Sequence, residues 1–274
     1  MRKEEIEDIE IQLLLDAIYK RYGHDFRNYS RASIKRRIRN ILGKENYSAI
    51  SQIIAPVLHD ESLFEKVIYD LSITVSEMFR DPEFFKTLRE LVVPYLKTHP
   101  FIKIWHAGCA TGEEVYSLAI VLKEEGFYDR STIFATDFND VALGRARDGI
   151  YPLERMKEFT ANYQRSGGAG SFSQYYTAGY DAAILEPSLR KNIAFANHNL
   201  VTDGVFSEVH FILCRNVLIY FDKTLQNRVL NLFRDSLAHG GVLALGSKET
   251  LQFTEVARNF KTLSQKWKIY QKTG

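Results

Sequence analysis

The chain has 274 residues, a formal net charge of +2, and 45% hydrophobic and 26% charged residues. This composition is typical of a globular protein and excludes a disordered, collagenous or coiled-coil chain. No segment approaches the ~18 consecutive apolar residues of a membrane span, and the N-terminus lacks the apolar stretch of a signal peptide. We therefore expect a cytoplasmic protein without membrane insertion. Because Cys109 and Cys214 have no ligand partners at metal-site spacing, we also expect no metal.

The first 100 residues have the periodicity of helices. Ile9, Leu13 and Ala17 recur at helical spacing, and Gly23 is a typical residue for the end of that helix. A second helix is predicted at residues 33–42, with its apolar residues on one side and several bases on the other. Further helical patterns cover residues 46–55, 60–71 and 82–97, with breaks at Pro56 and near Asp81-Pro82.

The charge of this helical region is uneven. Residues 1–16 hold six acids against two bases, whereas residues 20–44 hold nine bases against one acid, so this second stretch has a charge of +8. Such a surface attracts an anionic partner. Three interpretations are open: a solvated charged helix, a docking face for an acidic protein, and a phosphate-binding face for nucleic acid.

After Pro100, short apolar runs alternate with longer helical patterns, which predicts a parallel sheet with crossover helices. Helices are predicted at residues 113–125, 139–147 and 223–238, and residues 260–272 favour antiparallel edge strands. The parallel strands are predicted at residues 101–107, 132–136, 193–196, 209–214 and 242–245. The predicted fold is a small all-helical domain followed by a Rossmann-like α/β domain.

A segment at about residues 157–190 interrupts this alternation. It contains a glycine-rich stretch at residues 166–171, followed by Tyr175, Tyr176 and Tyr180. A structureless loop of this length is uncommon inside a compact domain, so we expect an insertion with a small β element and a glycine hinge. It is either a partner-binding surface or a variable surface excursion.

The first predicted strand runs into a glycine turn at residues 108–112, and a helix follows. Gly108 and Gly112 let a ligand approach the backbone at the carboxyl edge of the sheet. Glu113 and Glu114 occupy the first helical turn, where they would repel a phosphate but suit a ligand with positive charge, such as S-adenosylmethionine. Alternatively, both acids only interact favourably with the helix dipole.

The second predicted strand ends at Asp137. An acid at this point of a Rossmann-like fold accepts hydrogen bonds from a ribose diol. The competing explanation is that Asp137 caps the helix that follows. Together with the glycine turn, Asp137 favours an adenosine cofactor.

The chain resembles the bacterial chemotaxis protein methyltransferases, which use S-adenosylmethionine to methylate glutamates on chemoreceptors. The resemblance is nearly end to end. It is carried by the segments Thr74–Pro82, Trp105–Glu114, Ala135–Asp137, His198–Leu200, Cys214–Phe221 and Gly246–Glu249. Two departures occur in the first segment, because the family often has Asn and Thr at positions 74 and 76 and a Phe pair at 78 and 79.

The resemblance implies a set of cofactor contacts. Thr74, Ser76 and Arg80 would bind the methionine end, with Arg80 pairing with its carboxylate. Glu113 would hold the amino group, although the sequence does not separate it from Glu114. The remaining contacts would be Gly108 at the glycine turn, Asp137 at the ribose, Asn199 and Leu200 around the adenine, and Asn216 and Val217 beside it.

The resemblance also implies where the methyl acceptor binds. Arg215 and Tyr220, after the central strand, would face the methyl group and the incoming glutamate. The cationic helix would then dock the cytoplasmic helices of a chemoreceptor through Arg31, Lys35, Arg36 and Arg39. The central strand leads into Cys-Arg-Asn-Val and not into the Asp/Asn-Pro-Pro-aromatic motif of amino-directed nucleic-acid methyltransferases, so no nucleic acid is expected.

The expected organisation is a helical docking domain at residues 1–73, a linker and helix at residues 74–99 that contribute to the cofactor site, and a methyltransferase domain at residues 100–274. The expected activity is protein-glutamate O-methylation in chemotaxis signal transduction, with S-adenosylhomocysteine as by-product. The alternatives are a nucleic-acid or small-molecule methyltransferase and a cofactor-binding regulator without catalysis.

Overall fold

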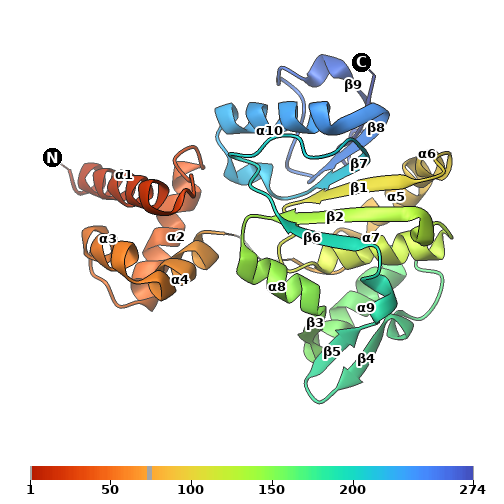
Figure 1. The fold of residues 1–274 in the computed structure, drawn as a ribbon, viewed down its shortest axis with the longest axis horizontal. Helices are drawn as coiled ribbons and strands as arrows, with labels where there is room; N and C mark the ends of the chain where they lie inside the picture. Colours follow the sequence, from red (N-terminus) through yellow and green to blue (C-terminus); the bar gives the residue numbers. More distant parts are fainter. Residues whose placement is uncertain (1, 73–75, 274) are drawn as a thin grey trace. The chain divides into compact units, whose positions relative to one another are not determined.

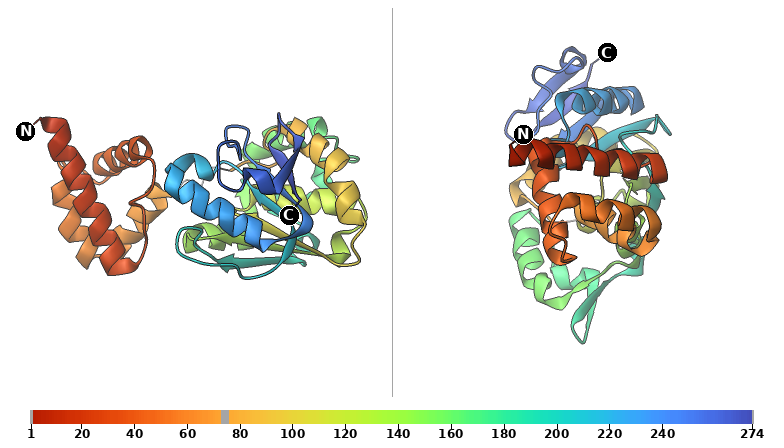
Figure 2. Two further views of the ribbon diagram at one scale, coloured as in Figure 1. Left: turned by 90° about the horizontal axis from the view of Figure 1, so that it is seen from above. Right: turned by 90° about the vertical axis from the view of Figure 1, so that its left-hand side faces the viewer.

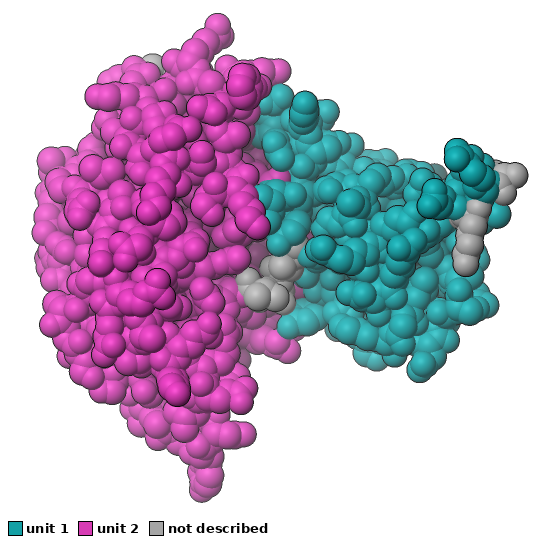
Figure 3. Space-filling model, turned by 180° about the vertical axis from the view of Figure 1, so that it is seen from behind, with its two compact units in different colours: residues 1–73, 219–228 teal, residues 74–218, 229–274 magenta. Residues whose placement is uncertain are grey.

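The computed structural model describes residues 2–72 and 76–273 and divides the chain into two compact units (Figure 3). Unit 1 comprises residues 1–73 and 219–228, and unit 2 comprises residues 74–218 and 229–274. The grouping of residues 219–228 with the N-terminal helices has no counterpart in the sequence analysis. Among the described residues, no helix is both long and apolar enough to cross a membrane.

The N-terminal helices of unit 1 pack together (Figure 2), and the first residues of α10 (Lys223–Ser236) also belong to this unit. The N-terminal helices are α1 (Lys3–Tyr22), α2 (Arg31–Lys44), α3 (Ile50–His59) and α4 (Glu61–Leu71). Gly23 ends α1 in a left-handed conformation with φ 79°, as the sequence predicts. The apolar side of α2 is buried through Ile34, Ile38 and Ile41, which confirms the predicted amphipathic helix.

The predicted helix break at Pro56 is wrong, because Pro56 lies inside α3. A proline within a helix removes one backbone hydrogen bond and strains the preceding turn. Here Ile53 and Val57, on either side of it, are fully buried, and the Tyr22 hydroxyl donates a hydrogen bond to the Val57 carbonyl at 2.9 Å. Tertiary packing of the apolar face therefore outweighs the local cost, and α3 continues to His59.

Unit 2 is an α/β domain (Figure 1). Its helices are α5 (Pro82–Leu91), α6 (Val93–Lys97), α7 (Glu113–Glu124), α8 (Asp140–Asp148), α9 (Met156–Arg165) and most of α10 (Lys223–Ser236). The strands of its large sheet are β1 (Ile102–Ala107), β2 (Ser131–Asp137), β6 (Ile193–Asn197), β7 (Val209–Cys214), β8 (Leu237–Leu245), β9 (Phe260–Ser264) and β10 (Ile269–Lys272).

The large sheet has seven strands in the order β6-β2-β1-β7-β8-β10-β9. The first five strands are parallel, and β10 joins β8 and β9 in antiparallel pairs. This topology confirms the predicted Rossmann-like domain with a mostly parallel sheet. The strand order reverses direction beside β1, so the ends of β1 and β7 lie where open α/β sheets bind ligands.

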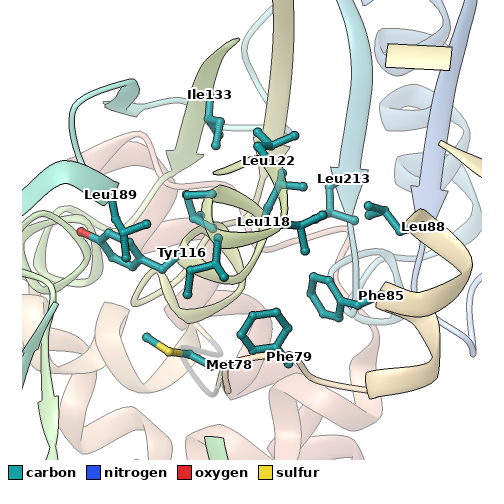
Figure 4. Packing of buried hydrophobic residues seen from close by; sticks show 14 of the residues in the cluster. Met78, Phe79, Phe85, Leu88, Tyr116, Leu118, Leu122, Ile133, Leu189 and Leu213 are labelled. Atoms are coloured by element: carbon teal, nitrogen blue, oxygen red, sulfur yellow. The ribbon is translucent and has the colours of Figure 1, made fainter. Parts of the chain in front are cut away.

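Side chains alternate between the two faces of the large sheet along each strand, and both faces are covered by helices. Ile104 of β1 and Leu213 of β7 face one apolar cluster with Phe85 of α5 and Leu118 of α7, and Figure 4 shows Phe85, Leu118 and Leu213 within it. Trp105 faces the other side, where its ring lies 5.3 Å from that of Phe233 in α10. The covered sheet supplies a rigid base for loops at its carboxyl edge.

A second, three-stranded antiparallel sheet contains two strands from the predicted insertion at about residues 157–190 and one strand, at residues 150–152, that precedes it. It consists of β3 (Ile150–Pro152), β5 (Ala182–Leu185) and β4 (Tyr176–Gly179) in that order. The glycine-rich stretch before β4 packs against Tyr163, whose hydroxyl accepts a hydrogen bond from the Gly170 amide at 3.0 Å. The segment that the sequence favours as a hinge therefore has defined partners in this structure.

Candidate functional site

The turn after β1 requires glycine at two positions. Gly108 has φ +73° and Gly112 has φ +90°, in the region that favours glycine. A Cβ atom at Gly108 would lie 2.6 Å from Cγ2 of Val217, and one at Gly112 would lie 2.8 Å from Cβ of Ala146. The turn therefore approaches its neighbours too closely for any side chain, and the backbone itself forms the surface at the sheet edge.

Asp137, at the end of β2, organises this turn. One carboxylate oxygen accepts the Ala110 amide at 2.9 Å, and the other accepts the Asn139 amide at 3.0 Å. Burial raises the pKa of Asp137, whereas the backbone amides act in the opposite direction. The Phe138 amide contributes a further backbone hydrogen bond to Asp137. A carboxylate has about four acceptor positions, so capacity for a ligand hydroxyl remains.

The two neighbouring acids at the start of α7 have different partners. Glu114 is buried, forms an ion pair with Nη1 of Arg215 and lies 3.3 Å from Nε2 of His106. Burial acts to raise the pKa of Glu114, but the Arg215 guanidinium and the His106 ring outweigh it and hold the pKa at about 2. Glu114 is therefore engaged within the protein.

Glu113 is also buried, with 3% exposure, but its only cationic partner is more distant than the Arg215 guanidinium beside Glu114 among the residues that the structure describes. Its Oε2 accepts the Thr111 hydroxyl at 2.7 Å, and its Oε1 lies 3.4 Å from Nη1 of Arg155. Burial raises the pKa of Glu113, and the Thr111 hydroxyl and the Arg155 charge partly counteract that effect. The Ser76 side chain also lowers the pKa of Glu113 through a hydrogen bond. A buried acid whose partners are two neutral hydroxyls and one distant cation is suited to bind an additional cation.

Arg215, which directly follows β7, has protein partners at both terminal nitrogens, whereas its buried Nε has no hydrogen-bond partner among the described residues. Its side chain is 1% exposed, Nη2 lies 2.5 Å from Asp81, and Nη1 donates to the Arg80 carbonyl at 3.2 Å. The guanidinium also lies 4.1 Å from the centroid of the Phe84 ring. The resemblance implies that Arg215 faces the methyl group, but its described contacts anchor the segment that carries Arg80.

The described part of the linker, residues 76–81, is tied to the rest of unit 2 through its backbone. The Ser76 carbonyl accepts a hydrogen bond from Nη2 of Arg155 at 3.0 Å, and the Met78 carbonyl accepts one from Nδ2 of Asn162 at 3.2 Å. The Phe79 amide donates to the Ser117 hydroxyl at 2.8 Å. Thr74, a predicted cofactor contact, lies outside the described residues.

Backbone strain at the end of this linker coincides with a half-buried cation. Phe79 and Asp81 both have left-handed φ values, 52° and 55°, which are unfavourable for residues other than glycine. Arg80 lies between them, and its side chain has no hydrogen-bond or ion-pair partner among the residues that the structure describes. The surrounding contacts thus hold a strained turn that presents the Arg80 guanidinium, which none of the described side chains pairs with.

The residues expected around the adenine follow β6. Asn199 closes a turn, since its side chain accepts the Val201 amide at 3.0 Å and its own amide donates to Asp203 at 2.9 Å. Leu200 is 7% exposed. The His198 amide donates to the Asp137 carbonyl at 3.1 Å, so this turn is tied to the end of β2.

Asn216 and Val217 follow β7. Asn216 has φ 60°, and its amide donates to Oε2 of Glu249 at 3.2 Å. Its side-chain oxygen Oδ1 is buried and has no hydrogen-bond partner among the described residues. Val217 packs against Gly108. Because a buried acceptor without a donor is costly, Oδ1 of Asn216 indicates a place for a ligand N–H or O–H.

Tyr220 and the four candidate docking residues belong to unit 1. The Tyr220 carbonyl accepts the Ser30 amide at 2.7 Å, and the Arg37 guanidinium lies 5.2 Å from the Tyr220 ring centroid. Lys35 and Arg39 both pair with Glu7 of α1, at 2.9 and 2.7 Å.

The two remaining docking candidates are exposed. Arg31 reaches the Asp8 carbonyl at 3.5 Å, and Arg36 has no hydrogen-bond or ion-pair partner among the described residues. The acidic first helix therefore neutralises part of the predicted cationic face, which the charge count of residues 20–44 does not reveal.

The structure thus brings the predicted residues that follow β6, β2, β1 and β7 to one edge of the sheet. Strands β6, β2, β1 and β7 are adjacent and parallel, so the turns that follow them share that edge. Two further residues at this edge, Arg155 and Asn162, lie outside the segments that carry the resemblance and were not predicted from the sequence. No local pattern marks either residue, since their partners lie about 40 to 80 positions earlier in the chain.

Two family models match the chain. The model described as "CheR methyltransferase, SAM binding domain" matches residues 74–269, and the model described as "CheR methyltransferase, all-alpha domain" matches residues 9–72. Together they cover both units apart from short terminal segments.

Curated relatives extend this similarity over the whole length. A protein named "Putative methyltransferase Cher3" from Pseudomonas putida is 51% identical over 273 residues and covers 100% of both chains. A chemotaxis protein methyltransferase from Listeria innocua is 33% identical, over 84% of this chain and 85% of its own length. Another from Salmonella typhimurium is 27% identical, over 95% and 89% respectively.

Proposed function

Because the chain belongs to the family of CheR chemotaxis methyltransferases, which methylate chemoreceptor glutamates with S-adenosylmethionine, we propose that its donor site is the carboxyl edge of β6, β2, β1 and β7. The chain is a protein-glutamate O-methyltransferase, and this family membership confirms the resemblance seen in the sequence. The assignment of individual residues to the site is our proposal.

The unequal engagement of Glu113 and Glu114 is the observation that carries this assignment. Glu114 is committed to Arg215 and His106, whereas Glu113 interacts with the hydroxyls of Thr111 and Ser76 and with a more distant guanidinium. Glu113 would therefore hold the ammonium group of the donor. The buried and unpartnered Oδ1 of Asn216 fits the same ligand, because an adenosyl group carries hydrogen-bond donors.

The other donor contacts follow the family pattern. Ser76 and Arg80, with Thr74 before them, would bind the methionine end. A pairing of Arg80 with its carboxylate is supported because the guanidinium has no ion-pair partner within the part of the chain that the structure describes. Asp137 has spare acceptor capacity for the ribose hydroxyls. The adenine would lie among Gly108, Asn199, Leu200, Asn216 and Val217.

Arg215 would act by positioning rather than by contact with the reacting groups. Its bonds to the Arg80 carbonyl and to Asp81 hold the strained turn that presents Arg80. Tyr220 would contact the incoming glutamate, since its hydroxyl can donate a hydrogen bond to a carboxylate.

The reaction needs no general base in the protein. When bound, S-adenosylmethionine supplies an activated methyl group with a neutral leaving group. A glutamate with a pKa near ~4.3 is already ionised at neutral pH. The protein must hold the carboxylate oxygen in line with the methyl group and exclude water, which is catalysis by proximity and desolvation.

The substrate would be a cytoplasmic helix of a chemoreceptor, docked on the helical domain of residues 1–73, and the enzyme would act in the cytoplasm. Among Arg31, Lys35, Arg36 and Arg39, the exposed Arg31 and Arg36 are the better candidates for first contact, because Glu7 holds the other two. The exposed glutamates of a receptor helix complement this charge.

The experiment is incubation of the protein with methyl-labelled S-adenosylmethionine and receptor-containing membranes. The expected product is a base-labile methyl ester on receptor protein, and it should be absent with an Asp137→Ala variant. Label in RNA or DNA, or binding of the donor without transfer to any receptor, would contradict the proposed function.

A further inference from the structure

Arg155 lies at the junction of the methionine-end residues, although no motif identifies it. It is the last residue of the 3-10 turn Leu153–Arg155 and directly precedes α9. Nη1 lies 3.4 Å from Glu113, and Nη2 donates to the Ser76 carbonyl at 3.0 Å. Both of these partners are residues that we assign to the methionine end of the donor.

The orientation of Arg155 is fixed while most of its donors remain unused. Its guanidinium lies 4.6 Å from the centroid of the Phe159 ring, one helical turn later. A guanidinium has five N–H donors, and only the contacts to Glu113 and Ser76 engage them among the described residues. The side chain is 31% exposed, so a ligand can reach the remaining donors.

Arg155 and Glu113 form a pair of opposite charges side by side, and the amino-acid end of the donor is itself a zwitterion. An ammonium group suits Glu113, and a carboxylate suits the planar fork of an arginine. We propose that Arg155 binds the α-carboxylate of S-adenosylmethionine together with Arg80. This inference rests on the proposed function, because it presumes that Glu113 holds the ammonium group.

Binding of a zwitterion by Arg155 and Glu113 together has a physical rationale. Without a ligand, Arg155 and Glu113 partly compensate each other's charge across 3.4 Å. A zwitterionic ligand gives each of them a closer partner of opposite charge, so that neither is left buried and uncompensated. A carboxylate can accept several hydrogen bonds, so Arg80 and Arg155 can share one group.

The competing explanation is that Arg155 only ties the linker to α9. Three ligands separate the two roles. S-adenosylhomocysteine carries both the ammonium and the carboxylate, decarboxylated S-adenosylmethionine carries the ammonium alone, and 5′-methylthioadenosine carries neither. If Arg155 binds the carboxylate, its loss weakens the binding of the first ligand only. If Arg155 only tethers the linker, its loss weakens the binding of every ligand that needs an ordered linker.

The experiment is calorimetric titration of the full chain and its Arg155→Met variant with these three ligands. Methionine keeps an unbranched apolar side chain over Phe159 but removes the charge. The affinity for S-adenosylhomocysteine should fall at least tenfold, whereas the affinities for the other two ligands should stay within about threefold. Arg155→Lys should recover part of the loss, because it restores the charge without the fork.

Arg165→Met is the matched control, because Arg165 is an exposed arginine at the end of α9, the helix that Arg155 precedes. This variant should leave all three affinities unchanged. An Arg155→Met protein that binds S-adenosylhomocysteine normally, or one that loses all three ligands equally, would overturn the inference. Failure of the unmodified chain to bind S-adenosylhomocysteine would instead overturn the proposed function.

Discussion

The ion pair between Glu114 and Arg215 makes a sharp prediction about stability. Replacing Glu114 with Gln leaves the Arg215 guanidinium, 1% exposed, with Asp81 as its remaining anionic partner. Removing one member of a buried pair costs about 3–5 kcal/mol, because the other charge stays buried. The Glu114→Gln variant should therefore unfold much more readily at neutral pH.

The pKa of Glu114 gives an independent magnitude for the same pair. Its pKa falls from 4.5 to about 2 in the folded protein, which corresponds to about 3 kcal/mol at ~1.36 kcal/mol per unit. A lowered folded-state pKa stabilises the protein above the unfolded-state pKa, and that stabilisation is lost as the pH falls towards the folded-state value. The difference between wild type and variant should therefore be constant above about pH 6 and shrink below pH 4.5.

Urea unfolding followed by tryptophan fluorescence measures this difference. The chain has two tryptophans, Trp105 and Trp267, and both belong to unit 2, so the signal reports on the unit that contains the pair. Glu90→Gln, at an exposed position of α5, is the matched control and should unfold like the wild type. Removing both charges in Glu114→Gln/Arg215→Met should cost less than either single change.

Two results would refute this reasoning. One is a Glu114→Gln protein whose free energy of unfolding lies within about 1 kcal/mol of the wild type at pH 7, which is below the range for a broken buried pair. The other is a difference that grows as the pH falls, because it would mean that Glu114 is protonated, and not ionised, in the folded protein.

Three further predictions concern binding and catalysis. Asp137→Asn should lower the affinity for S-adenosylhomocysteine at least tenfold in calorimetry. The reason is that an amide is a poorer acceptor for the ribose and for the Ala110 and Asn139 amides. Unchanged affinity would remove Asp137 from the site. Tyr220→Phe should lower kcat for receptor methylation severalfold and leave donor affinity unchanged, and a loss of donor affinity would contradict its assignment to the acceptor. Glu7→Gln releases Lys35 and Arg39, so the KM for receptor should fall at low ionic strength and converge with the wild type in high salt; a higher KM at low salt would argue against docking through this face.

Local patterns in the sequence were sufficient to predict the main elements. The apolar run at residues 209–214 predicts a covered central strand, and β7 has those bounds. Gly108 and Gly112 indicate a tight turn, and their left-handed φ values explain why only glycine fits. These features depend on residues close together in the chain, so the sequence displays them directly.

Charge counts were less informative, because the partners of a charged residue are set by tertiary packing. The +8 stretch of residues 20–44 indicates a cationic face, but α1 supplies Glu7 to Lys35 and Arg39. In the same way, Pro56 is a helix breaker by local propensity, and only the packing of Ile53 and Val57 explains why α3 continues.

The sequence by itself determined the order of domains, the Rossmann-like strand pattern, the glycine turn and the acids beside it, and thereby the family and its cofactor. Only the tertiary structure distinguished Glu113 from Glu114 and brought Arg155 to Glu113 and Ser76. The physical reason is that adjacent residues on a helix point in different directions, and their partners come from distant segments. An ion pair across 101 positions, such as that of Glu114 and Arg215, leaves no local trace in a sequence.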